Sequence, residues 1–288
     1  MILIAGFLAL FLLLWAIVYA LLPLTQRVGT LGAAFIASLS TRYERVGGLT
    51  NRFKAYLPIA VIVVAGGLLT AWAGDNFIDL AEMVHSKSPK LQRLDTFIHA
   101  WAISRRSPSA TAFFALMSNI GGPVGLGVLV AAVLIALLIL RRFRWVLYLL
   151  VTVGGGVLLD TELKGYFARA RPDLAEMLRQ ASGYSFPSGH AMGSTVVFGA
   201  LSYLAFRTTN RWSGKAAVLA LGITLIIAVS LSRVYLGVHW ISDVVAGISA
   251  GTLWVVITTM AYETVRRVQL LRSPQRESRS SSLDARGA

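Results

Sequence analysis

Long apolar segments alternate with short polar ones along most of this chain, and the charged residues gather between the apolar segments. Most of these segments have the about 17–25 residues that an α-helix needs to cross a bilayer. The pattern therefore predicts an all-α fold, a polytopic transmembrane helical bundle. The seven apolar runs cover residues 1–22, 56–74, 111–140, 145–163, 190–206, 216–232 and 241–262.

Two of the runs depart from the simple pattern. The run 111–140 is longer than the others and contains Gly121, Gly122 and Pro123, so it is either kinked there or begins as an interfacial segment. The run 1–22 lacks the basic residues that open a signal peptide, and it is long for the apolar part of one. We expect it to be a retained helix.

The runs divide the chain into three parts. We expect residues 1–55 to form an N-terminal transmembrane helix and a cytoplasmic linker, and residues 56–262 to form a membrane domain of six helices. Residues 263–288 are polar and rich in Ser and Arg, so we expect a disordered basic tail.

Composition narrows the class of protein. Of 288 residues, 56% are hydrophobic and 14% charged, which excludes an ordinary soluble domain. There is no cysteine, so disulfides, thiolate metal sites and cysteine nucleophiles are excluded. The net charge of +14 is not accompanied by a nucleic-acid-binding motif, so we expect basic helix flanks beside anionic lipids and no nucleic acid partner. No obligate protein partner is inferred.

The basic residues also predict an orientation. The loops 23–55, 141–144 and 207–215 and the tail 263–288 hold seventeen of the twenty-seven Lys and Arg residues. The expected loops 75–110, 161–189 and 233–240 on the other face hold the remaining ten. Cytoplasmic loops of membrane proteins carry such an excess, so the side with seventeen is expected to face the cytoplasm, with the N-terminus outside.

Ionisable residues and a serine gather on the opposite side of the predicted bundle, where several apolar runs begin or end. Intramembrane or interfacial charges of this kind usually serve function. Three cations, two imidazoles, a hydroxyl and a carboxylate suit a phosphate monoester. The residues are Lys164, Arg171, Ser188, His190, Arg233, His239 and Asp243.

We expect each residue type to have a chemical task there. In this hypothesis Lys164, Arg171 and Arg233 neutralise phosphoryl oxygens, where charge spreads in the transition state. Ser188 and the Gly189 amide hold a phosphate oxygen at the start of a helix. His239 and Asp243 are four residues apart, so on a helix the carboxylate orients the imidazole for attack on phosphorus.

His190 then protonates the leaving oxygen and later activates water. No cluster of carboxylates resembles a magnesium site, so we expect no metal and no cofactor.

Three motifs resemble the signatures of the type 2 phosphatidic acid phosphatase (PAP2) superfamily, which also includes vanadium haloperoxidases. They are K-x6-RP at 164–172, PSGH at 187–190 and SR-x5-H-x3-D at 232–243. The resemblance implies a six-helix core, a metal-independent phosphatase and a phosphohistidine intermediate. It carries the same eight residues into the site: His239, His190 and Asp243 as catalytic, and Lys164, Arg171, Ser188, Gly189 and Arg233 as phosphate-binding. The first run and the 23–55 loop are extra to the family pattern.

We therefore expect an integral membrane lipid phosphatase, in a bacterial inner membrane, with its active site on the extracytoplasmic face. Undecaprenyl diphosphate, phosphatidylglycerol phosphate, phosphatidic acid and lipid A phosphates all fit, because the motifs contact only the shared phosphoryl group. A lipid phosphotransferase using the same phosphohistidine is an alternative, and a transporter is another. A haloperoxidase is disfavoured by the hydrophobic spans.

Other polar residues receive plainer interpretations. Arg169 and Arg179 are expected to be membrane-surface anchors. His85 and His99 are expected to be ordinary interfacial histidines. Asp160 and Glu162 precede Lys164, and tuning of that lysine is one alternative for them, but we expect them to be solvated or to pair with a neighbour on the helix.

Overall fold

The protein is a helical bundle in this computed structural model, which describes residues 3–21, 23, 47–172 and 174–284. A helix at Leu3–Leu21 precedes the labelled elements. No strand occurs among the described residues, so the predicted all-α class is confirmed. The further elements are α2 (Gly47–His85), α3 (Pro89–Ser104), α4 (Pro108–Ile120), α5 (Pro123–Ile139), α6 (Phe143–Phe167), the 3₁₀ turn η2 (Leu174–Glu176), α7 (Gly189–Thr208), α8 (Trp212–Tyr235) and α9 (Ile241–Asp284).

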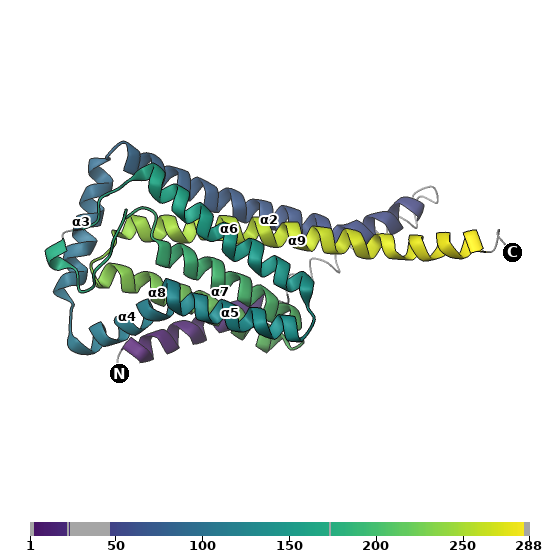
Figure 1. The fold of residues 1–288 in the computed structure, drawn as a ribbon, viewed down its shortest axis with the longest axis horizontal. Helices are drawn as coiled ribbons and strands as arrows, with labels where there is room; N and C mark the ends of the chain where they lie inside the picture. Colours follow the sequence, from purple (N-terminus) through teal and green to yellow (C-terminus); the bar gives the residue numbers. More distant parts are fainter. Residues whose placement is uncertain (1–2, 22, 24–46, 173, 285–288) are drawn as a thin grey trace.

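The long helices lie side by side, and α3 crosses one end of them (Figure 1). α7 is central, since it packs against α5, α6, α8 and α9. The Leu3–Leu21 helix starts near the end that carries α3, and α9 extends beyond the opposite end (Figure 1). The role predicted for the linker 23–55 falls largely outside the described residues.

By length and apolarity, four helices among the described residues can cross a membrane, or five if a bent pair counts as one span. They are Leu3–Leu21, Phe143–Phe167, Trp212–Tyr235 and Ile241–Leu270, with Pro108–Ile120 and Pro123–Ile139 as the bent pair. Seven spans were predicted. α7 lies in the bundle but is not apolar enough to meet the same test. A helix surrounded by other helices contacts little lipid, so small residues that allow close packing matter more there than apolar ones.

The bend between α4 and α5 is one of the two alternatives left open for residues 111–140. The two helices meet at 48°. Gly121 and Gly122 supply the break, and Pro123 starts the new helix at a position where its missing N–H costs nothing. A side chain at Gly121 would collide with Val229 of α8, so glycine also lets α8 come close.

Two segments contain more helix than the sequence predicted. The segment 75–110 was expected to be a loop but contains α3, which Pro89 opens and Arg105 ends. The tail was expected to begin at 263, and α9 continues past this position to Asp284. The first turn after this position is fixed, because Tyr203 donates a 2.7 Å hydrogen bond to the buried Glu263 and Arg266 donates another at 2.8 Å.

Candidate active site

Six of the eight predicted site residues line one cavity of about 710 Å³. They come from elements far apart in sequence: the last turn of α6, the loop after it, the start of α7, the last turn of α8 and the loop before α9. All these positions lie at the end of the bundle that α3 crosses (Figure 1). The six residues are Lys164, Arg171, Gly189, His190, Arg233 and His239.

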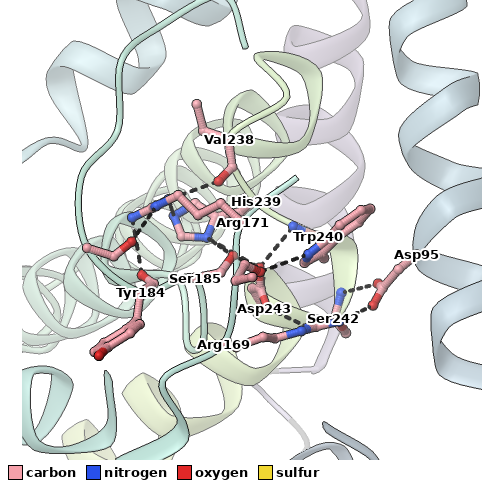
Figure 2. Close-up of polar contacts among 12 residues, drawn as sticks. Asp95, Arg169, Arg171, Tyr184, Ser185, Val238, His239, Trp240, Ser242 and Asp243 are labelled. Atoms are coloured by element: carbon pink, nitrogen blue, oxygen red, sulfur yellow. Dashed lines mark hydrogen bonds and ion pairs between the residues drawn. The ribbon is translucent and has the colours of Figure 1, made fainter. Parts of the chain in front are cut away.

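The two nitrogens of His239 have different neighbours, as Figure 2 shows. Nε2 lies 3.1 Å from Nη1 of Arg171, and Nδ1 lies 3.4 Å from Oδ2 of Asp243. A guanidinium can only donate hydrogen bonds, so Nε2 accepts and the ring proton is on Nδ1, facing the carboxylate. The cavity-lining imidazole thus has an unprotonated Nε2, the form that a nucleophile requires.

Burial of His239 also favours the neutral form of its ring. The side chain is 2% exposed, and burial lowers its pKa from the ordinary 6.5 to about 4, while the neighbouring Asp243 opposes the shift. The imidazole is therefore neutral at physiological pH.

Asp243 is fixed from three sides. Its Oδ2 accepts hydrogen bonds from the Ser185 hydroxyl and, at 2.9 Å, from the backbone N–H of Trp240. Arg169 donates to Oδ1 at 2.6 Å. A carboxylate with this many donors keeps one orientation, and that orientation faces Nδ1 of His239.

The Arg171 guanidinium is held by the surrounding loops. Its three nitrogens donate to the backbone carbonyls of Ser182, Gly183, Tyr184 and Val238 at 2.9–3.2 Å. Together with the contact to His239, these bonds engage all five N–H groups. Burial lowers the pKa of Arg171, and Asp243 opposes the shift. The residue thus presents a positive charge in a fixed place, and a bound anion must exchange with one of these acceptors.

Lys164 and Gly189 are coupled. The Lys164 ammonium pairs with Asp160, one turn earlier on α6, which agrees with the helix-pairing interpretation of Asp160. A side chain added at Gly189 would collide with both Nζ of Lys164 and the Asp160 carboxylate. Gly189 therefore contributes space for the lysine, which the sequence did not reveal.

Arg233 and His190 complete the polar wall of the cavity. Arg233 is 5% exposed, and its Nη1 donates to the Ser118 hydroxyl at 2.5 Å. His190 lines the same cavity as Lys164, Arg171, Arg233 and His239. The two predicted imidazoles and three predicted cations thus share one space.

Ser188 is placed differently from the prediction. Its side chain is fully buried and does not line the cavity. Its hydroxyl has no hydrogen-bond partner among the described residues, while its backbone N–H donates to the Asp243 carbonyl at 2.9 Å. In this structure Ser188 joins α7 to α9.

Sequence reasoning missed several residues of the site. Arg169 was interpreted as a surface anchor, but its side chain is 15% exposed and it bridges Asp243 and Asp95. Asp95 and Ser185 were not singled out at all, because no motif or spacing marks them. His99 is also more than an interfacial histidine, since it is buried and its Nε2 lies 2.9 Å from the Glu176 carboxylate.

No group of three or more His, Cys, Asp or Glu side chains suited to hold a metal ion occurs in the described part of the chain. The polar cavity wall instead combines ammonium and guanidinium groups with imidazoles, which is a donor set for an anion.

Comparison with known proteins identifies relatives. The model of the PAP2 superfamily matches residues 145–267. Phosphatidylglycerophosphatase B of Bacillus subtilis is 29% identical over 192 residues, which cover 66% of this chain and 93% of that protein. Undecaprenyl-diphosphatase of Sulfolobus acidocaldarius is 41% identical over 81 residues, 28% of this chain and 34% of that protein.

A solved structure has a similar fold. The crystal structure of a transmembrane PAP2 type phosphatidylglycerolphosphate phosphatase from Bacillus subtilis superimposes with a TM-score of 0.64 at 28% identity. The match covers 68% of this chain and 96% of that one.

Proposed function

We propose that the chain is a membrane phosphatase of the PAP2 superfamily, whose model matches residues 145–267, and that it hydrolyses a lipid phosphate through a phosphohistidine on His239. One observation supports this most: two imidazoles and three cations line a cavity whose remaining wall is largely apolar. The polar part suits a phosphoryl group, and the apolar part suits a hydrocarbon chain.

The apolar wall is formed by three helices. α5, α6 and α7 face one another across it, so a bound chain runs between helices and not into water. A water-soluble phosphate ester gains nothing from such a wall. The apolar lining includes Leu126, Val130, Leu134, Val153, Val157, Val196 and Val197.

The proposed reaction has two steps. In the first, Nε2 of His239 attacks phosphorus, the bond from phosphorus to the lipid oxygen breaks, and His190 gives that oxygen a proton. In the second, His190 takes a proton from water, the water oxygen attacks phosphorus, the bond from phosphorus to Nε2 of His239 breaks, and inorganic phosphate is released. Arg171 and Arg233, with Lys164, offset the negative charge in both steps.

The matched test replaces one histidine in the cavity and one outside it. His239→Ala should lower the rate at least about a thousandfold, as removal of a covalent nucleophile generally does. The exposed His85→Ala should retain wild-type turnover. Near-normal turnover of His239→Ala contradicts the proposal.

The assay itself uses purified protein, a panel of phospholipid and polyprenyl phosphates, and EDTA in the buffer. Released inorganic phosphate identifies a hydrolase, whereas a doubly phosphorylated lipid identifies a phosphotransferase. Activity in EDTA is expected to persist; a complete loss restored by magnesium points to another mechanism. The panel also identifies the preferred lipid, because its members share the phosphoryl group and differ only in hydrocarbon chain and headgroup.

A further inference from the structure

A buried ionic network lies behind the His239–Asp243 pair and does not line the cavity that contains His239 and His190. Arg169 donates from Nη1 to Oδ1 of Asp243 at 2.6 Å and from Nη2 to Oδ2 of Asp95 at 2.7 Å, as Figure 2 shows. Arg169 is 74 residues from each carboxylate in the sequence. The network thus connects α3, the loop after α6 and the start of α9.

Ser242 closes the network. Asp95 accepts from the Ser242 backbone N–H at 3.1 Å and from its hydroxyl at 2.7 Å. Arg169 also donates to that hydroxyl at 2.7 Å. Asp95 therefore holds both the guanidinium and the first turn of α9, the turn that carries Asp243.

The charges explain why the arginine matters. Asp95 is 2% exposed and Asp243 is fully buried, and Arg169 is the cation that bridges the two. Removing one partner of a buried ion pair leaves an uncompensated charge, which is strongly unfavourable. Without Arg169, Asp243 loses a charged donor to Oδ1 and its negative charge is no longer compensated from that side, so it holds Nδ1 of His239 less firmly.

We propose that Arg169, held by Asp95, is a positioning residue for the reaction: it keeps Asp243 ionised and turned toward Nδ1 of His239. This inference rests on the proposed function, because Arg169 acts only through the His239–Asp243 pair. A purely architectural role would instead tie α3 to α9 without affecting the chemical step.

Three variants separate these roles. Arg169→Ala should lower kcat by about tenfold to a hundredfold, the range found for partners that orient catalytic groups, with KM within about twofold. Asp95→Asn should lower kcat in the same direction but less. Combined with Arg169→Ala, Asp95→Asn should add little, because both changes remove the same support.

Chemical rescue supplies a readout that architecture alone does not give. A second cavity of about 780 Å³ is lined by Asp95, Arg169 and Trp240 among others, so a small cation has access to the space that Arg169→Ala opens. Added guanidinium should raise the kcat of Arg169→Ala several-fold. It should not raise the kcat of the wild type or of Arg105→Ala, which removes an exposed arginine on the same end of the molecule.

The same assay distinguishes a failure of the positioning role of Arg169 from a failure of the proposed function. If His239→Ala stays active in the same assay, the proposed function is wrong. Three results would show that the positioning role is wrong while His239→Ala is inactive. They are a kcat of Arg169→Ala within about twofold of the wild type, a change in KM alone, and a kcat of Arg169→Ala that added guanidinium does not raise. Should Arg169→Ala fail to fold, Arg169→Gln removes the charge but keeps a polar side chain that donates hydrogen bonds, and an unchanged kcat in that variant equally overturns the inference.

Discussion

At the scale of single residues, the candidate site depends on which group neighbours each atom. Imidazole is symmetric enough that either nitrogen can carry the proton, and only the Arg171 and Asp243 contacts distinguish them. Arg171 in turn has its fork fixed by backbone carbonyls. Two predictions belong to this scale.

The first concerns pH. Since the pKa of His239 is about 4 in the folded protein and about 6.5 when exposed, the unfolded chain binds more protons between these values. The stability that the neutral ring contributes is complete above pH 6.5 and is lost as the pH falls through 4. An NMR titration of the ring, assigned with His239→Gln, should show its midpoint far below 6.5. A midpoint near 6.5 contradicts the burial argument.

The second concerns Gly189. A methyl group there collides with the Lys164 ammonium, so Gly189→Ala should displace this charge from the cavity and lower kcat/KM by about tenfold or more, as loss of one charged contact does. The neighbouring Gly165→Ala is the matched control, because a side chain at Gly165 meets only open space. Equal kinetics for the two variants would show that the lysine adjusts freely.

At the scale of elements, two glycines of α9 decide how α7 and α9 meet. Gly247 and Gly251 are four residues apart and lie on one helix face. A side chain at Gly247 would come within 2.7 Å of the Ser188 carbonyl, and one at Gly251 within 2.9 Å of the Met192 carbonyl. This close approach allows the Ser188 N–H to reach the Asp243 carbonyl, so helix packing sets the geometry of the site.

We predict that Gly251→Val weakens this contact. Because the obstacle is backbone, α9 must shift, and overpacking of this kind costs about 1–3 kcal/mol. The melting temperature in detergent should fall by roughly 3–10 °C, with a loss of activity. Gly67→Val, which adds a side chain on an open face of α2, should change the melting temperature far less. The reverse order would mean that α9 tolerates the shift.

At the scale of the whole molecule, the ends of the bundle differ in chemistry. The candidate site, α3 and η2 occupy one end. The loops 140–142 and 209–211, which contain Arg141, Arg142 and Arg211, lie at the ends of α6, α7 and α8 that are opposite to their site residues. Basic loops favour the cytoplasm, so we propose that the site faces away from it. This places the reaction on the extracytoplasmic surface.

Cysteine labelling tests the orientation without background, because the chain has no cysteine. In intact bacterial cells, a membrane-impermeant maleimide should label Lys90→Cys on α3 and should label Arg211→Cys only after permeabilisation. Both positions are exposed in the structure. Labelling in the opposite order places the site on the cytoplasmic face.

The sequence by itself determined the membrane class, offered the bend at Gly121–Gly122 as one of two alternatives, and supplied the candidate residues of the site. Apolar run length reports the need to satisfy backbone groups inside lipid, and ionisable residues beside such runs are costly enough to mark a site. These are local properties, so they can be read along the chain.

Only the tertiary structure decided which groups support that chemistry. Arg169 resembles any arginine at a helix end, and Asp95 lies in a segment expected to be a loop, yet folding brings both to Asp243. The placement of Ser188 outside the cavity and the space that Gly189 gives to Lys164 depend equally on contacts between separate helices. Such contacts have no fixed sequence spacing, because they follow from how whole helices pack.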